Sequence, residues 1–427
     1  MICDAPLSRT QQLKGQKLLN RFSWMNGFSY MCLGETIIIL FAVKLACPNT
    51  LVAALGAMQQ FAFVMMPLGK MVTARIGAAQ SQGSFWVCRN IAALLVASAA
   101  VWEYLGQHLI AQCAILAGAF FFYGFRAAGV VMSKPLAGNF TVEKDRAAFF
   151  ARNTSAFYIS SIAALLMITV ILRYSDSVWI LTAIIVLGSS IGITSSKFFR
   201  QMDESSVIRE SARRPIRKEL GHAFRNSHFR SLQYAQVGMA VSMIMLHPPG
   251  LLTLKRGCNV SDMGMLLYTL IVFGTGAFMS WYAGKIIPRI GVRKTILFGH
   301  ALRLLIPWFW IFMPEPYSPG LAVIPFLLYG VTSVVTSDAA SQYFLRALPP
   351  RSQVAAAMIS AVIADALSGV LGMVFAAGLL KLAEHLAGNA DSVYTQFRIY
   401  FMLSFIVCAA FTFYPVLKLK RFAEKTE

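Results

Sequence analysis

The chain has 427 residues, of which 57% are hydrophobic and 13% are charged. Ordinary soluble domains carry about 25% charged residues, so this composition excludes a typical water-soluble protein and predicts that lipid is the solvent. The net charge of +20 would suggest nucleic-acid binding in a soluble chain, but Lys and Arg lie in short segments between apolar runs, which is typical of charges that set membrane orientation.

Twelve apolar stretches are long enough to cross a bilayer, since a spanning helix needs about 20 mostly apolar residues. They lack the period of two that membrane barrel strands show, and backbone groups in hydrocarbon have to pair within one segment. The chain is therefore predicted to be an all-α membrane protein. Pro248 and Pro249, at the outer end of the seventh span, are expected to form an outer turn; the alternative is a discontinuous helix at a transport site. The expected spans are Phe22–Val43, Leu51–Val72, Ile91–His108, Leu109–Met132, Ala151–Leu172, Ser177–Phe198, Ser231–Leu252, Met263–Ile286, Thr295–Met313, Gly320–Phe344, Val354–Leu380 and Tyr400–Leu417.

The longest polar stretch, Lys197–Arg230, separates six expected spans from six others. It predicts an N-terminal six-helix bundle over residues 1–198, a cytoplasmic linker over 199–230 and a C-terminal six-helix bundle over 231–427. Two interpretations of the linker stay open. It is either a solvated connection or a short amphipathic helix that lies on the membrane surface.

Basic residues are distributed very unequally between the two sides of the membrane. Thirty of the 38 Lys and Arg residues fall in the tails and in the loops after even-numbered spans, six fall on the other side, and Arg126 and Arg303 lie within spans. Basic loops stay in the cytoplasm, so both termini are predicted to be cytoplasmic. The expected location is a cell membrane, the inner membrane of a bacterium, and no cleavable signal stands out before the first span.

Several functional classes are disfavoured by what the sequence lacks. The 7 cysteines show no Cys-x-x-Cys spacing, so no metal or redox site is expected, although Cys47 and Cys258 fall in equivalent outer loops and a disulfide between them is conceivable. No phosphate-binding loop and no catalytic motif is present, which argues against an ATP-driven pump and against an enzyme. We expect no cofactor and no nucleic-acid partner, and we expect a monomer.

Two basic turns repeat at nearly constant spacing. They read "PLGKMVTARIG" from Pro67 and "AGKIIPRIGVRK" from Ala283, with Gly69 and Gly284 separated by 215 positions and Gly77 and Gly291 by 214. Each turn follows the second expected span of its half, which predicts two six-helix halves in the same orientation, a parallel repeat. Glycine allows helices to approach closely, and the basic residues could cap the carbonyls that end the second helix of each half.

With these turns the sequence resembles the major facilitator superfamily. The resemblance implies twelve spans in two parallel six-helix bundles, with a signature of Gly, three residues, Asp, Arg, any residue, Gly, any residue and two basic residues after spans two and eight. The second copy matches at Gly284, Arg289, Gly291, Arg293 and Lys294, with Pro288 in place of the Asp. The first copy keeps Gly69, Arg75 and Gly77, with one extra residue, with Thr73 or Ala74 where the Asp is expected, and without the basic pair that ends the signature.

A third patch, "EKDRAAFFARN" from Glu143 to Asn153, is similar to the loop after span four in the same family. The resemblance implies an inner gate between the bundles. Its candidate residues are Asp145, Arg146 and Arg152.

Four ionisable residues at membrane depth are candidates for substrate binding or proton coupling, because each costs about 2.5–3.5 kcal/mol to insert. Glu35 and Arg126 lie in spans one and four, which line the cavity in the family, and they could form either a functional pair or a structural ion pair. Asp338 in span ten could act at a gate or reach the interface. Asp365, near the middle of span eleven, could carry a proton.

The predicted function is secondary active transport, by symport or antiport, of a small organic solute. The two bundles would alternate access to a central site, and Glu35 or Asp365 would couple transport to protons. Arg126 hints at an anionic or zwitterionic solute. The alternative is a protein of the same fold that does not pump, with a role in membrane assembly or lipid handling.

Overall fold

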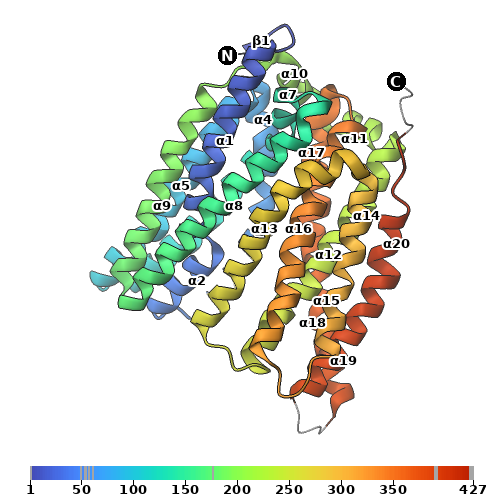
Figure 1. The fold of residues 1–427 in the computed structure, drawn as a ribbon. Coiled ribbons are helices and arrows are strands. Elements are labelled where there is room, and N and C mark those ends of the chain that lie inside the picture. Colours follow the sequence, from blue (N-terminus) through green and yellow to red (C-terminus); the bar gives the residue numbers. More distant parts are fainter. Residues whose placement is uncertain are drawn as a thin grey trace. The chain divides into compact units, whose positions relative to one another are not determined.

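The computed structural model describes residues 2–48, 51, 55, 58–59, 62–175, 177–388 and 393–422. It is built almost entirely of helices (Figure 1), which confirms the all-α prediction. Within the described residues, 10 helical segments are long and apolar enough to span a membrane. The chain divides into two compact units, the first with residues 1–220 and Pro349–Ile359 and the second with Gly221–Leu348 and residues 360–427.

The first unit is organised around five long helices, α1, α5, α6, α8 and α9. Helix α1 packs against α8 and α9, and α5 packs against α6 and α9 (Figure 1). The elements of this unit are β1 (Ile2–Cys3), α1 (Arg9–Cys32), α2 (Glu35–Lys44), the 3₁₀-helix η1 (Ala62–Met65), α4 (Met66–Ile76), α5 (Ala78–Tyr104), α6 (His108–Val130), α7 (Ser133–Phe140), α8 (Glu143–Tyr174), α9 (Val178–Arg200), β2 (Glu204–Ser205), α10 (Ser206–Arg213) and η2 (Pro350–Ser352), while α11 (Ile216–Arg225) and α17 (Gln353–Ala361) cross its boundary.

The first two expected spans differ from continuous helices. Span one is divided into α1 and α2 by a break at Leu33 and Gly34, where Gly34 adopts an extended backbone conformation (φ −62°, ψ 161°). Part of the second expected span, Leu51–Val72, lies outside the described residues, and its described end consists of η1 followed by α4.

The third span begins much earlier than the sequence predicts. Helix α5 starts at Ala78, directly after Gly77, whereas the apolar run starts at Ile91. Four polar residues in between are buried, namely Ser81, Gln82, Arg89 and Asn90. Arg89 was therefore wrongly counted as a loop cation, because it is 1% exposed within α5.

In the second unit, α13 and α14 pack against α16, and α12 packs against α18. The ninth span is divided at Leu304 into two shorter helices, which is why it is absent from the membrane-length segments. The elements are α12 (Ser227–Arg256), α13 (Asp262–Ile290), α14 (Val292–Arg303), α15 (Leu305–Ile311), α16 (Pro319–Ala347), the π-helix η3 (Val362–Leu367), α18 (Ser368–Ala387), α19 (Val393–Val407), the π-helix η4 (Cys408–Thr412) and α20 (Phe413–Leu417).

Pro248 and Pro249 do not end the seventh span. Helix α12 continues through both residues to Arg256, so the expected turn is wrong. A proline has no N–H to donate to the carbonyl four residues earlier, and for Pro249 that carbonyl belongs to Met245. The Tyr400 hydroxyl donates to this oxygen at 2.5 Å, so a side chain from α19 satisfies the acceptor and the helix persists.

The first part of the linker packs against the first unit. In α10 the side chains of Ile208, Ser211 and Ala212 are buried, and the helix contacts α4 and η2. This part of the linker is therefore not a solvated connection.

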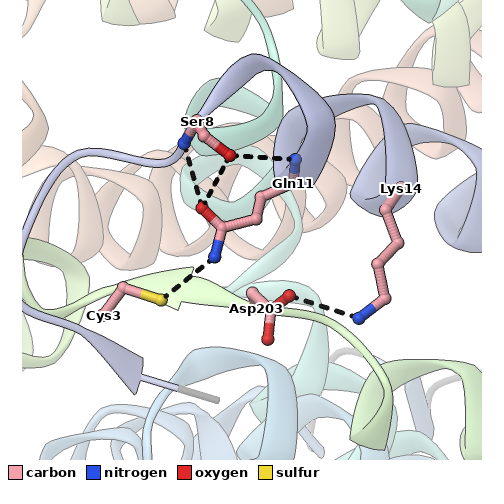
Figure 2. Close-up of polar contacts among 5 residues, drawn as sticks. All are labelled: Cys3, Ser8, Gln11, Lys14 and Asp203. Carbon is pink, nitrogen blue, oxygen red and sulfur yellow. Dashed lines mark hydrogen bonds and ion pairs between the residues drawn. The ribbon is translucent and has the colours of Figure 1, made fainter.

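A short parallel ladder joins the N-terminal segment to the linker. Ile2 pairs with Glu204, and Cys3 pairs with Ser205. Figure 2 shows two contacts beside the ladder: the Gln11 amide donates to Sγ of Cys3 at 3.6 Å, and Lys14 donates to Oδ2 of Asp203 at 3.2 Å. Partial burial acts to raise the pKa of Asp203, but the hydrogen bond and the charge of Lys14 outweigh this effect and lower it.

Cys47 and Cys258 are both free thiols in the structure. Burial raises the pKa of Cys258 to about 11. Because the thiolate is the reactive form, this cysteine is a poor nucleophile at neutral pH.

Candidate functional site

The two signature turns have the same backbone geometry. Gly77 and Gly291 adopt φ values of 92° and 88°, which L side chains rarely adopt, and each glycine is the N-cap of the helix that follows. Upstream of the first turn, a Cβ on Gly69 would lie 2.1 Å from the carbonyl oxygen of Ala128. Glycine at this position therefore permits the close contact between α4 and α6, while Gly284 is half-buried in α13.

A carboxylate occupies the first turn although the signature acid is missing there. Glu204, 2% exposed, accepts hydrogen bonds at Oε2 from the backbone N–H groups of Ala78 and Ala79, at 2.8 and 2.9 Å. A helix N-terminus favours such a negative group. Burial raises the pKa of Glu204, and the two amide hydrogen bonds oppose this shift. Sequence reasoning missed this residue, whose only signal is the acidic pair at the start of the linker.

Basic residues of the turns bind carbonyls, but not those predicted. Lys70 donates from Nζ to the carbonyls of Ala212 and Arg214, at 2.7 and 2.6 Å, at the C-terminal end of α10. Arg293 donates from Nε to Leu419 at 2.6 Å and from Nη2 to Leu417 at 3.2 Å, at the end of α20. These residues therefore hold later helices, whereas capping of the second helix of each half was expected. Arg75 and Arg289 are exposed in the last turns of α4 and α13.

Alanine is expected to be worse at Gly77 than at Gly291. Both variants would meet the conformational penalty of positive φ, about 1–3 kcal/mol. Only at Gly77 would the new Cβ also lie 1.9 Å from Oε1 of Glu204, whereas nothing lies within 4 Å at Gly291. Thermal unfolding of the two purified variants measures the difference. Equal losses of stability would show that the Glu204 contact contributes nothing.

Two of the three predicted gate residues line one cavity. Asp145, in the first turn of α8, forms an ion pair with Arg9 of α1. Asp145 and the exposed Arg152 border a cavity of about 500 Å³ together with Lys17. Arg146 is half-buried and is not among the lining residues. The full lining is Arg9, Leu13, Gln16, Lys17, Asn20, Asp145, Ala148, Phe149 and Arg152.

Arg126 is half-buried in α6 and contacts two neutral groups. Its Nη1 atom lies 3.4 Å from Oε1 of Gln59, and its Cζ atom lies 5.3 Å from the centre of the Tyr30 ring. Both contacts stabilise the guanidinium without removing its charge. The predicted pairing with Glu35 stays a prediction, because the Glu35 side chain lies outside the described part of the structure.

The two predicted proton carriers occur where helices are irregular. Glu35 is the first residue of α2, directly after the break in span one, and Asp365 belongs to the π-helix η3. Such breaks and bulges are frequent at functional sites. The Asp365 side chain, like that of Glu35, lies outside the description. Asp338 is 6% exposed in α16 of the second unit.

Two buried arginines, Arg89 and Arg303, are further ionisable residues within the helices. The sequence analysis placed Arg303 within a span and counted Arg89 in a loop, yet the two are 214 positions apart, as are Gly77 and Gly291. They are 0% and 1% exposed, respectively. This common spacing was the signal that could have identified Arg89.

A chain of membrane-length helices that repeats one glycine-capped turn and holds charged side chains within its helices has the architecture of a multi-pass membrane transporter. The sequence profile of the Major Facilitator Superfamily matches residues 19–373, and the chain belongs to this family. It is therefore a transporter rather than an enzyme. No curated protein sequence matches it significantly.

Solved structures with this fold are similar to the chain at low sequence identity. FucP in the outward conformation has a TM-score of 0.72 and 12% identity, over 96% of this chain and 100% of that chain. A bacterial homologue of the iron transporter ferroportin, in an outward-facing state, has a TM-score of 0.67 and 12% identity, over 96% and 98%. The proton:xylose symporter XylE has a TM-score of 0.63 and 13% identity, over 94% and 96%.

Proposed function

We propose that this transporter moves a small organic anion or zwitterion by alternating access and couples the movement to protons. The observation that carries the proposal is Arg126, a half-buried guanidinium held by the neutral groups of Gln59 and Tyr30. Arginine stays charged in proteins. A carboxylate or phosphate on the solute is the chemical group that compensates this charge with the best geometry.

The cavity between α1 and α8 supports the same substrate class. Its lining contains three basic residues, Arg9, Lys17 and Arg152, and one acidic residue, Asp145. A concave site with an excess of one charge concentrates ligands of the opposite charge. Its volume of about 500 Å³ is sufficient for a small metabolite.

In the proposed coupling, Glu35 or Asp365 holds the proton. Binding of the solute anion at Arg126 would favour protonation of Glu35, since two negative groups would otherwise compete for one guanidinium. The excess of basic residues in alternate loops supports an orientation with both termini in the cytoplasm. Within this proposal the host membrane is the bacterial inner membrane.

Proteoliposomes with an imposed pH gradient test the coupling. Asp365→Asn is expected to abolish gradient-driven accumulation of a labelled organic anion and to spare exchange with preloaded anion, because the amide cannot release a proton but leaves the solute site unchanged. Glu384→Gln, an exposed acid on α18, is the matched control and should transport like the wild type. Uphill accumulation by Asp365→Asn would exclude this residue as the proton carrier.

One observation favours the alternative of lipid handling. The second unit carries an apolar groove of about 500 Å³, which could hold an acyl chain. It is lined by Leu305, Trp308, Phe309, Phe312, Met313, Pro314, Leu321 and Ile324. In the same liposomes, movement of labelled lipid that ignores the ion gradient, together with absent anion flux, would support this alternative and contradict the proposal above.

A further inference from the structure

Arg89 and Arg303 occupy equivalent places in the two halves of the chain. Each is the twelfth residue of its helix, α5 or α14, and each of these helices begins after a glycine with positive φ. Both guanidinium groups are buried, so each needs partners that compensate its charge. The partners that the two residues have are very different.

Arg303 is fully satisfied by its own unit. Nη1 donates to the carbonyl of Met239 at 2.8 Å and to Oγ of Ser242 at 3.1 Å, both on α12. The Nε–Nη2 edge faces α16, where Thr332 accepts at Oγ1 and at its carbonyl, both at 3.4 Å, and Thr336 accepts at 3.2 Å. Every nitrogen has a partner, which makes Arg303 a structural link between three helices.

Arg89 has only one hydrogen bond among the described residues. Nη1 donates to Oδ1 of Asn26 at 3.2 Å, while Nε and Nη2 have no partner in the described part of the chain. Aromatic rings cover the guanidinium, since its Cζ atom lies 4.7 Å from the centre of the Phe122 ring and 5.3 Å from that of Trp86. The open Nε–Nη2 edge presents parallel N–H bonds, the geometry that binds a carboxylate or phosphate in bidentate fashion.

The sequence explains why this edge is open in the first half. The spacing of 214 that relates Arg89 to Arg303 places Gly118 and Phe122 where the second half has Thr332 and Thr336. Neither residue offers a side-chain acceptor. The contacts agree with this alignment, because Arg89 meets Phe122 and Arg303 meets Thr336. The two acceptor hydroxyls that satisfy the second copy are therefore absent from the first.

Arg89 and Arg126 are neighbours. Their contacts on α1 are Asn26 and Tyr30, which lie one helical turn apart and thus on one face of that helix. The charge of Arg126 also acts on Arg89, together with the hydroxyl groups of Tyr30 and Tyr123. Two guanidinium groups with phenol donors nearby form a strongly positive region inside the apolar unit.

We propose that Arg89 is the second guanidinium of the anion site and that its open edge binds the carboxylate or phosphate group of the transported solute together with Arg126. This inference rests on the proposed function and extends it, because a bidentate fork selects planar or tetrahedral oxyanions over halides and uncharged solutes. Arg89 then determines specificity, while Arg303 keeps a purely structural role.

The test uses the purified full-length protein, with inorganic phosphate and acetate as probes at constant ionic strength, and reads the shift in thermal unfolding against probe concentration. Arg89→Lys keeps the charge but loses the fork, and it should weaken binding of the preferred probe by about tenfold. Asn26→Asp places a carboxylate beside Nη1 of Arg89 and should weaken binding similarly with the fold intact. Arg303→Lys, the matched control, should leave the apparent affinity unchanged even where it lowers the unfolding temperature.

The outcomes distinguish a failure of the proposed role of Arg89 from a failure of the proposed function. Unchanged affinity in both Arg89→Lys and Asn26→Asp, combined with a loss in Arg126→Ala, overturns the role of Arg89 alone. A wild-type protein that responds to neither probe contradicts the anion site as a whole. If Arg89→Lys fails to fold, the result for Asn26→Asp decides. The stronger of the two probes identifies phosphate or carboxylate as the recognised group.

Discussion

Replacing Arg126 with alanine is expected to weaken binding of the transported anion by about tenfold to a hundredfold, because a hydrogen bond to a charged group contributes about 1.5–3 kcal/mol. The variant also loses the cation that compensates the solute charge, so transport should fall at least as far. The measurement is a thermal-shift screen of purified protein against carboxylates, phosphates, sugars, nucleosides and cations, repeated with Arg126→Ala. A hit in the wild type that disappears in the variant identifies the substrate class.

The matched control for this screen is Arg173→Ala, which removes an exposed arginine from the last turn of α8. It lowers the net charge by the same amount, so it reports any general effect of charge on anion binding. An Arg126→Ala protein that responds to the same anions as Arg173→Ala would contradict the proposed role of Arg126. A wild-type response confined to sugars or nucleosides would contradict the anionic substrate.

The second large effect is expected on stability, from Arg303→Gln. Removing one member of a buried, fully hydrogen-bonded network costs about 3–5 kcal/mol, and Arg303 links α14 to acceptors on α12 and α16. Glutamine is too short to reach both helices, so Ser242 and Thr336 would lose their donor. Unfolding of the purified protein in mild detergent, monitored by tryptophan fluorescence, measures the change.

Arg289→Gln is the control for this variant, because Arg289 is exposed in the last turn of α13 and should change stability by no more than about 0.5 kcal/mol. Arg303→Lys should lie between the two, since lysine keeps a donor but not the fork. Equal unfolding of Arg303→Gln and Arg289→Gln would refute the structural role.

The fold was predictable because hydropathy identifies helices that meet lipid. The same method failed where a helix buries polar residues against its own unit. Arg89 and Asn90 interrupt the apolar run and were taken for loop residues, yet α5 carries them inward. A rule based on apolar length cannot distinguish a polar residue in a loop from one that faces a neighbouring helix.

Contacts between segments far apart in the sequence were the second feature that the sequence analysis could not predict. Tyr400 satisfies the Met245 carbonyl that Pro249 leaves without a donor, and the first signature turn receives its carboxylate from Glu204. No local sequence pattern predicts either contact. The spacing of the repeated turns was the exception, since it identifies equivalent positions in the two halves and thereby relates Arg89 to Arg303.

The parallel ladder between β1 and β2 has a consequence for biosynthesis. Its first strand leaves the ribosome ahead of every helix of the unit, and its second strand follows only after α9. The β1–β2 ladder can therefore form only when all the long helices of that half have been translated. A fusion partner in front of Ile2 would therefore lie next to a contact that forms only after α9 has been made.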